Sequence, residues 1–569
     1  MNEQTYLQQV KALQAARWPK GTTREPIYPH GEKPVTEYLS AWARLNPTKV
    51  AIQFYGYELT YAQLDEMSTR FANVLRGLGV GQGDGVAVFM PNCPQFHIAF
   101  FGILKCGAVH MPVSPLSKEM ELRHQLGDSQ PKVALCYDAL LPTMRPVCQE
   151  LGIEHIITTS YTDVRPRAIT AVLPDLFEIP KAPLADGIID FFEAIDNASK
   201  EVLDYIPALD DLAAINYTSG TTGMPKGVMH THRNMIGTMA SYYPVTFGEV
   251  GPEGTDLVML SFLPEFWIAG EDTGLLLPLY SGATLVLMAR WDTKAFMELV
   301  HHHKVNMTIM LIDSVDEILN HPQLHQFDLT SLTTVPCISF IKKLNRDYRQ
   351  RWRELTGTTL FEVAYGMTET HTCDTFTRGF QVDDMDLSFD PAFLGLPVPG
   401  TEIKICDFVT GELMPLGVEG EIQIRTPTLL TGYWNKPDLN KNLFEEGGWY
   451  RTGDLGMITE EGFFRYLGRR KEMLKVNGMS VFPTEVESML GQHPAIASCG
   501  VVGRPDERKG QVPVAFVTLK PGFDETQESL QAWCVNAMAI FKVPEIRIQE
   551  RLPMTATGKI RKVDLEKSL

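Results

Sequence analysis

The chain has 569 residues, enough for several folding units and far more than a simple binding module needs. Hydrophobic residues make up 44% and charged residues 21%, an ordinary globular composition that excludes disordered, collagen-like and coiled-coil proteins. The formal net charge is −18, and the 51 lysines and arginines do not cluster, so we expect no nucleic-acid partner. A small anionic ligand is still compatible with this charge, because a few backbone amides and one lysine can bind a nucleotide.

The cysteines and the apolar stretches indicate in which cellular compartment the protein is expected. The nine cysteines are an odd number without CxxC spacing, so reduced thiols in the cytoplasm are expected. The first twenty residues lack the apolar core of a secretory signal. The longest apolar stretch, 273–288, is interrupted by Pro278 and Gly282, so no stable membrane insertion is expected. The sequence does not distinguish a monomer from a homodimer.

Over most of its length the chain alternates between apolar β-branched runs and amphipathic stretches. Residues 86–90 and 108–113 read as strands around a helix at 95–105. This alternation predicts an α/β fold with buried, largely parallel strands. Residues 173–200 are rich in proline and aspartate and are predicted to form a long surface connection.

A loop rich in glycine and hydroxyl groups follows a predicted strand at 213–217 and precedes a predicted helix at 234–243. It reads Thr-Ser-Gly-Thr-Thr-Gly-Met-Pro-Lys-Gly at 218–227. Glycines let backbone amides approach phosphate oxygens, hydroxyls donate hydrogen bonds or bind magnesium, and a lysine offsets charge. The loop is not a Walker A sequence, since Pro225 stands where that pattern requires glycine. A plain surface turn is the alternative reading.

From residue 402 the pattern changes to short strands with glycine-centred turns. Antiparallel strands are predicted at 402–406, 420–425, 456–459 and 463–467, followed by a charged cluster at 469–472. Helices at 485–492 and 528–541 and strands at 498–502 and 512–519 then predict a small α+β domain. We therefore expect two domains, 1–467 and 468–569, with a hinge at 468–472.

The loop at 218–227 closely resembles the signature of the AMP-forming acyl-adenylate superfamily, which includes acyl-CoA synthetases, nonribosomal peptide adenylation domains and beetle luciferases. Further matches follow in the family's order, so the resemblance covers nearly the whole chain. They are Leu-Thr-Tyr-Ala-Gln-Leu-Asp at 59–65, Lys-Cys-Gly-Ala-Val-His-Met-Pro at 105–112, Tyr-Gly-Met-Thr-Glu-Thr at 365–370, Tyr-Arg-Thr-Gly-Asp at 450–454, Gly-Arg-Arg-Lys at 468–471 and Pro-Met-Thr-Ala-Thr-Gly-Lys at 553–559.

The resemblance implies a fold and a reaction. The fold is a large N-terminal body of two α/β sheets plus a distorted antiparallel β-barrel, covered by a small mobile α+β lid. In the reaction, a carboxylate attacks the α-phosphorus of ATP, and the thiol of coenzyme A then attacks the acyl adenylate. ATP, Mg²⁺, coenzyme A and a small-molecule carboxylic acid are the implied cofactors and partners. Both steps have charged transition states, so positioning and electrostatics should dominate catalysis.

The resemblance also assigns roles to residues. The implied ATP-binding set is Thr218, Ser219, Gly220, Thr221, Thr222, Gly223, Lys226, Tyr365, Asp454 and Arg469. The implied catalytic set is Lys559, Thr368 and Glu369 in adenylate formation and Lys475 in thioester formation. Glu369 and Thr221 are the candidate magnesium ligands. Lys471 is the hinge residue about which the lid would rotate, and Gly478 would leave room for the thiol of coenzyme A. The implied acid pocket contains Trp267, Gly366 and Phe340.

The chain departs from the family pattern at the acid pocket. Trp267 stands where the family usually has histidine, and residues 333–340 lack the usual Gly-Gly-Ala loop, which predicts a short channel and a small acid. Glu265, Glu271, Asp272 and Asp313 lie nearby in sequence, and we expect them to face water or cap helices. If one faces inward beside Trp267, an acid with a quaternary ammonium or sulfonium group is favoured.

Three functions stay open at this point. The first is an acid:CoA ligase, and the second is an adenylate-forming enzyme that passes the acyl group to a carrier protein or another acceptor. The third is a degenerate nucleotide-binding regulator, suggested by the missing glycine loop. The joint presence of Thr368, Glu369, Asp454 and Lys559 argues against the third.

Overall fold

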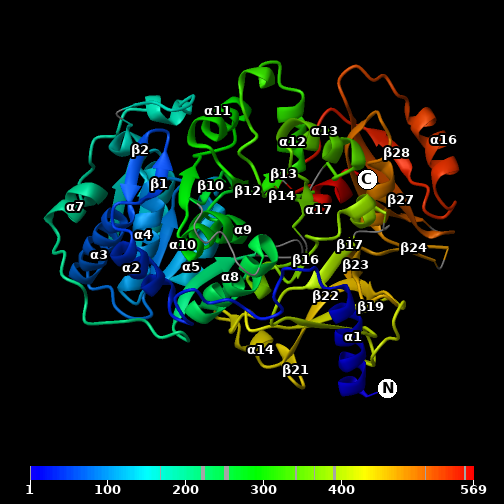
Figure 1. Ribbon diagram of the computed structural model, residues 1–569, viewed down its shortest axis with the longest axis horizontal. Helices are drawn as coiled ribbons and strands as arrows, with labels where there is room; N and C mark the ends of the chain where they lie inside the picture. The colour runs from blue at the N-terminus through cyan, green and yellow to red at the C-terminus, as the bar shows by residue number, and fades with distance from the viewer. Residues whose placement is uncertain are drawn as a thin grey trace.

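The computed structural model describes residues 2–166, 168–218, 225–248, 256–339, 342–363, 365–388, 393–477, 479–506, 508–555 and 559–569. The predicted site residues at 219–223, Phe340 and Gly478 lie outside these ranges. In Figure 1 the two α/β sheets occupy one half of the molecule, and the antiparallel sheet and the C-terminal part occupy the other.

The largest sheet is α/β and has the strand order β20-β9-β8-β4-β3-β5-β6-β7. Its strands are β3 Gly85–Phe89, β4 Val109–Pro112, β5 Val133–Tyr137, β6 His155–Thr159, β7 Ile188–Asp190, β8 Leu212–Tyr217, β9 Gly227–Thr231 and β20 Gly432–Tyr433. Strands β3 to β8 pair in parallel, as predicted from their apolar runs, and β9 returns antiparallel to β8. Helices α4 Pro94–Lys105 and α6 Leu141–Leu151 each connect neighbouring strands, whereas α5 Glu119–Ser129 connects β4 to β5 on the other side of β3.

The predicted surface connection at 173–200 is wrong in its middle part. It contains strand β7 and helix α7 Phe191–Asn197. Strand β7 extends the large sheet beyond β6, and the Phe191 and Ile195 side chains are buried. The Asp190 carboxylate caps α7 by accepting a hydrogen bond from the Glu193 N–H. The apolar residues at 188–195 decided the local structure, and the prolines around them masked this signal.

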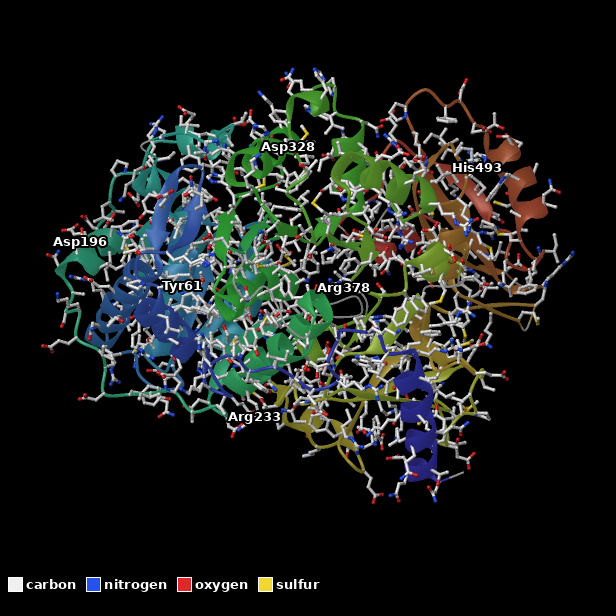
Figure 2. The ribbon with its side chains drawn as sticks, in the orientation of Figure 1. Tyr61, Asp196, Arg233, Asp328, Arg378 and His493 are labelled. Carbon is white, nitrogen blue, oxygen red and sulfur yellow. The ribbon has the colours of Figure 1, made fainter. Side chains whose placement is uncertain are left out.

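The second α/β sheet has the order β12-β10-β11-β1-β2. Its strands are β1 Val50–Phe54, β2 Tyr57–Thr60, β10 Val258–Ser261, β11 Thr284–Leu287 and β12 Met307–Thr308, and helices α2 Val35–Leu45, α3 Tyr61–Gly77, α8 His232–Phe247 and α11 Thr293–His303 belong to the same half. A short parallel sheet follows, formed by β13 Met310–Leu311, β14 Pro336–Ile338 and β15 Phe361–Glu362, with helices α12 Ile312–Leu319 and α13 Arg346–Thr356. Tyr61 lies in the interior, where its hydroxyl donates to the Ala283 carbonyl, whereas Asp196 lies at the rim (Figure 2).

The third of the larger sheets, called the third sheet below, is antiparallel and carries the distorted barrel. Its order is β16-β17-β23-β22-β19-β18, with β16 Thr375–Phe376, β17 Phe393–Pro397, β18 Glu402–Cys406, β19 Gly420–Arg425, β21 Phe444–Glu445 beside β22 Trp449–Ile458, and β23 Phe464–Arg469. Helix α1 Glu3–Arg17 packs on this sheet rather than on its sequence neighbours (Figure 1). Tyr6 and Val10 of α1 lie in one apolar cluster with Ile403, and Glu3 pairs with Lys404.

The C-terminal part has its own sheet and its own apolar cluster. Strands β24 Leu474–Val476, β25 Met479–Val481, β26 Ile496–Asp506, β27 Gly510–Leu519 and β28 Glu545–Ile548 combine with helices α15 Pro483–Leu490, α16 Gln527–Ala537 and α17 Lys562–Glu566. The predicted fold class, a large body of α/β sheets and a distorted barrel with a small α+β C-terminal domain, is confirmed. None of the helices in the described ranges is both long and apolar enough to cross a bilayer.

Candidate active site

The ends of the glycine-rich loop are pinned together where β8 leaves and β9 begins. The Thr218 N–H donates to the Lys226 carbonyl at 3.0 Å, and the Lys226 N–H donates to the Thr218 hydroxyl at 3.3 Å. The Lys226 ammonium lies 4.5 Å from the centre of the Tyr433 ring, a cation–π contact. This contact links the base of the loop to β20.

Tyr433 also joins Lys226 to the Thr-Glu motif. The motif forms the short 3₁₀ turn η6 Thr368–Thr370. The Tyr433 hydroxyl donates to Glu369 Oε1 at 3.0 Å and lies 3.0 Å from the Tyr450 hydroxyl, while the Glu369 carbonyl accepts from the Leu430 N–H. A lysine, a carboxylate and two phenols thus meet at the end of β9.

The Asp454 carboxylate contacts two side chains, one through each of its oxygens. Its Oδ2 accepts from the Tyr365 hydroxyl at 2.6 Å, and its Oδ1 lies 3.2 Å from Nε of Arg469. Asp454 and Arg469 face each other because β22 and β23 pair antiparallel with these two residues in register. Burial raises the pKa of Asp454, and the charge of Arg469 opposes that rise.

Lys559 reaches the same place from the far end of the chain. Its backbone is held against Thr555, which donates its N–H to the Lys559 carbonyl at 2.7 Å. The Lys559 ammonium lies 5.9 Å from the centre of the Trp267 ring. The residue is exposed, yet desolvation and the charge of Arg469 lower the pKa of its ammonium, and Asp454 counteracts them. The structure therefore brings Lys559, Trp267, Asp454 and Arg469 to one site.

The other two predicted lysines lie nearer the junction between β23 and β24. Lys471 lies in the turn η8 Arg470–Glu472, where desolvation and the charge of Arg469 lower its pKa. Lys475 lies on the hairpin of β24 and β25, exposed to solvent, and its N–H donates to the Gln511 side chain. Lys559 rather than Lys475 is the lysine placed against Trp267.

Gly366 shows why the Tyr-Gly pair needs glycine. A Cβ atom on Gly366 would lie 2.4 Å from the Cys373 nitrogen and 2.9 Å from the Thr372 carbonyl carbon, both backbone atoms that cannot yield. The backbone at 371–373 therefore packs directly on Gly366.

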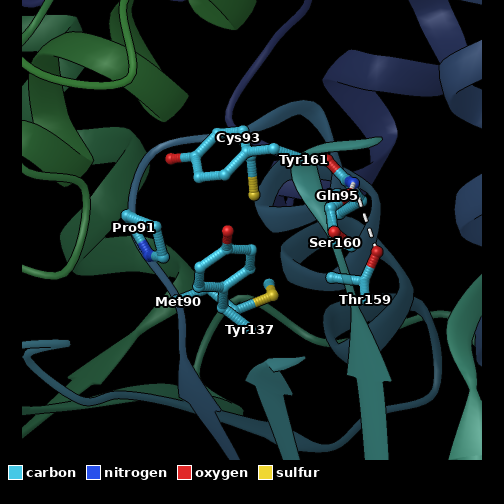
Figure 3. A pocket seen from close by; sticks show the side chains of 8 residues that line it. All are labelled: Met90, Pro91, Cys93, Gln95, Tyr137, Thr159, Ser160 and Tyr161. Carbon is cyan, nitrogen blue, oxygen red and sulfur yellow. Dashed lines mark hydrogen bonds between the residues drawn. The ribbon is translucent and has the colours of Figure 1, made fainter. Parts of the chain in front are cut away.

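The wall that carries Trp267 is anchored from behind by Asn92. The Asn92 side chain donates to the Leu263 carbonyl at 2.9 Å and accepts from the Glu265 N–H at 2.9 Å. Beside Asn92, at the carboxyl ends of β3, β5 and β6, a small recess is lined by Met90, Pro91, Cys93, Gln95, Tyr137, Thr159, Ser160 and Tyr161 (Figure 3). The Tyr161 hydroxyl donates to the Asn92 carbonyl there, which further fixes this wall.

The prediction that the nearby carboxylates face water is wrong for three of the four. Glu265 and Glu271 have no exposed surface and Asp272 keeps 6%. Each has a polar partner from a distant segment: His97 lies 2.6 Å from Glu265, the Asn216 side chain donates to Glu271 at 2.9 Å, and Nδ1 of His371 lies 3.1 Å from Asp272. Asp313, the fourth, is half-buried on α12.

His371 is the residue that the sequence analysis missed. It is fully buried, and its Nε2 lies 3.4 Å from Glu271. Desolvation lowers its pKa, but Asp272 and Glu271 outweigh that effect and raise the pKa to about 10. His230 meets it edge-on with ring centres 4.6 Å apart. Burial and the neighbouring His371 lower the pKa of His230 well below its usual value. The available signal was a pair of histidines, His230 within strand β9 and His371 directly after the Tyr-Gly-Met-Thr-Glu-Thr motif.

Two family models match this chain. The model of the AMP-binding enzyme family matches residues 39–434, and the model of the AMP-binding enzyme C-terminal domain matches residues 485–559. The chain belongs to the AMP-binding enzyme family, within which the relatives described next are acid:CoA ligases.

Two curated relatives and one solved structure illustrate the similarity. The chain is 32% identical to a long-chain-fatty-acid–CoA ligase of Bacillus subtilis over 96% of both chains. It is 30% identical to 4-coumarate–CoA ligase 2 of Solanum tuberosum over 90% of this chain and 89% of that one. The anthranilate CoA ligase AuaEII in complex with anthranoyl-AMP superposes with a TM-score of 0.80 at 26% identity, covering 94% of this chain and 97% of that one.

Proposed function

We propose that this chain is an ATP-dependent carboxylic acid:CoA ligase that acts through an acyl-AMP intermediate and releases AMP and pyrophosphate. The observation that carries the proposal is the approach of Lys559 to Trp267 beside the Asp454–Arg469 pair. This arrangement brings together a cation from the C-terminal end of the chain, an aromatic ring and a buried carboxylate. These groups suit the acid, the α-phosphate and the ribose of ATP.

In the first half-reaction the residues around Lys226 would hold the β- and γ-phosphates. Lys226 is the cation at the loop's base, and Thr368 would donate its hydroxyl to the α-phosphate. Asp454 offers acceptor oxygens to the ribose hydroxyls, while Tyr365 and Arg469 fix its orientation. Because Asp454, Tyr365 and Arg469 already contact one another, little reorganisation of these three would be needed as charge develops.

The donor set around Glu369 fits Mg²⁺. Among the described residues no group of three or more histidine, cysteine, aspartate or glutamate side chains could enclose a metal. Mg²⁺ itself takes one or two protein oxygens and fills its shell with waters and phosphate oxygens. Glu369 supplies such an oxygen, oriented by the Tyr433 hydroxyl, and Thr221 is the second proposed ligand. When bound, the ion would neutralise phosphate charge.

Lys559 would act on the reacting atoms themselves. Its ammonium would draw the substrate carboxylate toward the α-phosphorus and stabilise the charge of the pentavalent transition state. For the second half-reaction, residues 468–569 would rotate as a lid relative to 1–467 about the hinge at 468–472. Lys475 and Gly478 would then replace Lys559 at the site and admit the thiol of coenzyme A.

The acid is proposed to be small rather than long and aliphatic. Behind Trp267 lie the buried side chains of Glu271, Asp272 and His371, which pair with one another. The argument for a short channel is that Trp267 stands where the family usually has histidine, and that residues 333–340 carry side chains where the family has its Gly-Gly-Ala loop. A betaine-type acid has a weaker case, because each of the three buried carboxylates already has a polar partner.

ATP–pyrophosphate exchange over an acid panel, repeated with and without coenzyme A, tests the proposal. Hexanoate, benzoate, a betaine acid and palmitate cover the classes at issue. We expect exchange with a small acid and release of its CoA thioester when coenzyme A is present. Exchange that never yields a CoA thioester would favour the alternative acceptor, and equal preference for palmitate would refute the argument for a small acid.

A further inference from the structure

Three consecutive residues after the Thr-Glu motif adopt a backbone conformation that side chains disfavour. His371, Thr372 and Cys373 have φ angles of 56°, 54° and 56°. Positive φ is rare for residues other than glycine, and for the β-branched Thr372 it is a true outlier. Such a segment persists only where its surroundings impose it, and such segments cluster at functional sites.

Asp272 contacts two of the three residues in this segment. One of its oxygens lies 3.1 Å from Nδ1 of His371, and the other accepts the Thr372 hydroxyl. A single carboxylate thus holds two successive residues of the left-handed segment. From the opposite side the Thr238 hydroxyl of α8 donates to the His371 carbonyl at 3.2 Å.

Asp272 is itself held by an unusual piece of helix. It is the second residue of the π-helical turn η4 Glu271–Leu276, which follows α9 Ile268–Gly270 and precedes α10 Leu277–Ser281. Short π-helical turns interrupt regular helices and occur frequently at functional sites. The turn is buried, so Asp272 is presented from a rigid element.

The left-handed segment is coupled directly to the Thr-Glu motif. The Met367 carbonyl accepts from the N–H groups of Thr370 and Thr372, and the His371 N–H donates to the Thr368 carbonyl. A rotation at 371–373 therefore moves Thr368 and Glu369 as well. The segment also packs on Gly366, as its missing Cβ requires.

We propose that Asp272 is a positioning residue for ATP: it holds His371 and Thr372 in the left-handed conformation and thereby sets the places of Thr368 and Glu369. The proposal rests on the proposed function, in which these two residues contact the α-phosphate and Mg²⁺. It assigns Asp272 to the nucleotide side of the site rather than to recognition of the acid.

The test compares Asp272→Asn, Asp272→Ala and the double variant Asp272→Ala with Thr372→Gly. Both single variants should raise KM for MgATP at least fivefold and lower the exchange rate about tenfold, with KM for the acid within twofold of wild type. Because glycine adopts positive φ without strain, Thr372→Gly should restore at least half of what Asp272→Ala loses. The rise in melting temperature on adding MgATP provides a readout that needs no turnover.

Asp386→Asn is the matched control, since it breaks another buried ion pair, with Arg349, away from these residues. It should lower the melting temperature and leave KM for MgATP within twofold. A change confined to KM for the acid, a double variant without rescue, or an equal effect of Asp386→Asn would overturn the proposal. If the wild-type chain shows no exchange with any acid, the proposed function is refuted. The rise in melting temperature on adding MgATP, compared between wild type and the Asp272 variants, would still test whether Asp272 positions the ATP site.

Discussion

The ammonium of Lys559 faces the indole ring of Trp267 at 5.9 Å. One residue comes from the C-terminal part of the chain and the other from the wall beside the buried carboxylates. A cation–π contact of this kind is worth about 0.5–2 kcal/mol, enough to bias the position of the proposed C-terminal lid without locking it. The role proposed for Lys559 in adenylate formation requires the lysine to reach this part of the molecule, and the contact with Trp267 is compatible with that role.

Lys559→Ala should separate the two half-reactions. We expect ATP–pyrophosphate exchange to fall by about 10²–10³, the typical loss for one preorganised charge-stabilising donor. Conversion of supplied acyl adenylate to thioester should stay within threefold of wild type, because Lys475 would serve that step. Single-turnover assays of each half-reaction measure both, and equal losses in the two would show that Lys559 has another role.

The lowered pKa of Lys559 predicts how exchange depends on pH. The protonated ammonium is the active form, so exchange should decline as the pH rises through a pKa below the ordinary 10.5. In Lys559→Arg the guanidinium stays charged at every accessible pH. The variant should exchange more slowly than wild type, but its exchange rate should stay level over the alkaline range in which the wild-type rate declines. An identical alkaline decline in both proteins would contradict the assignment.

Lys471→Pro should leave adenylate formation intact and stop thioester release. Proline fixes φ near −65° and would prevent the backbone rotation proposed for the turn at 470–472. We expect exchange within threefold of wild type and CoA thioester formation reduced at least a hundredfold. Lys471→Ala, which keeps the rotation possible, is the control and should retain both activities.

Glu362 gives a prediction about stability. Burial raises the pKa of Glu362 from 4.5 to about 7, although the Ser339 hydroxyl donates to it. Because the pKa of Glu362 is higher in the folded state than in the unfolded state, folding is favoured while the group is protonated, below about pH 4.5. This contribution to stability is lost as the pH rises from 4.5 to about 7. Glu362→Gln removes this loss, so the stability of the variant relative to wild type should rise by roughly 3 kcal/mol between pH 4.5 and about 7 and stay level above that. Melting temperatures at several pH values check it, and a constant difference would contradict it.

Local patterns in the sequence were sufficient for most of the fold. Alternating apolar residues placed β18 and β19 at their observed bounds, because one face of an antiparallel strand is buried and the pattern has a period of two. The motifs likewise anticipated that Asp454, Arg469 and Lys559 meet. Strand β7 was missed because a three-residue strand is too short to show a period.

The buried network could not be read from the sequence in the same way. Glu265, Glu271 and Asp272 lie within eight residues of one another and resemble exposed charges. Their polar partners come from other segments of the chain. Those partners, His97, Asn216 and His371, come from α4, β8 and the turn after η6. Spacing along the chain carries no information about such pairings.

Helix α1 has a consequence for how this protein is shortened or tagged. Its Tyr6 and Val10 complete the apolar cluster of the third sheet, and Glu3 holds both Lys404 and the Trp449 indole N–H. A chain trimmed to the family-matched region from residue 39 would open that cluster to water and leave Lys404 without this ion pair. Helix α1 is therefore an integral part of the barrel's packing. An affinity tag should be joined in front of this helix through a flexible linker and should not replace it.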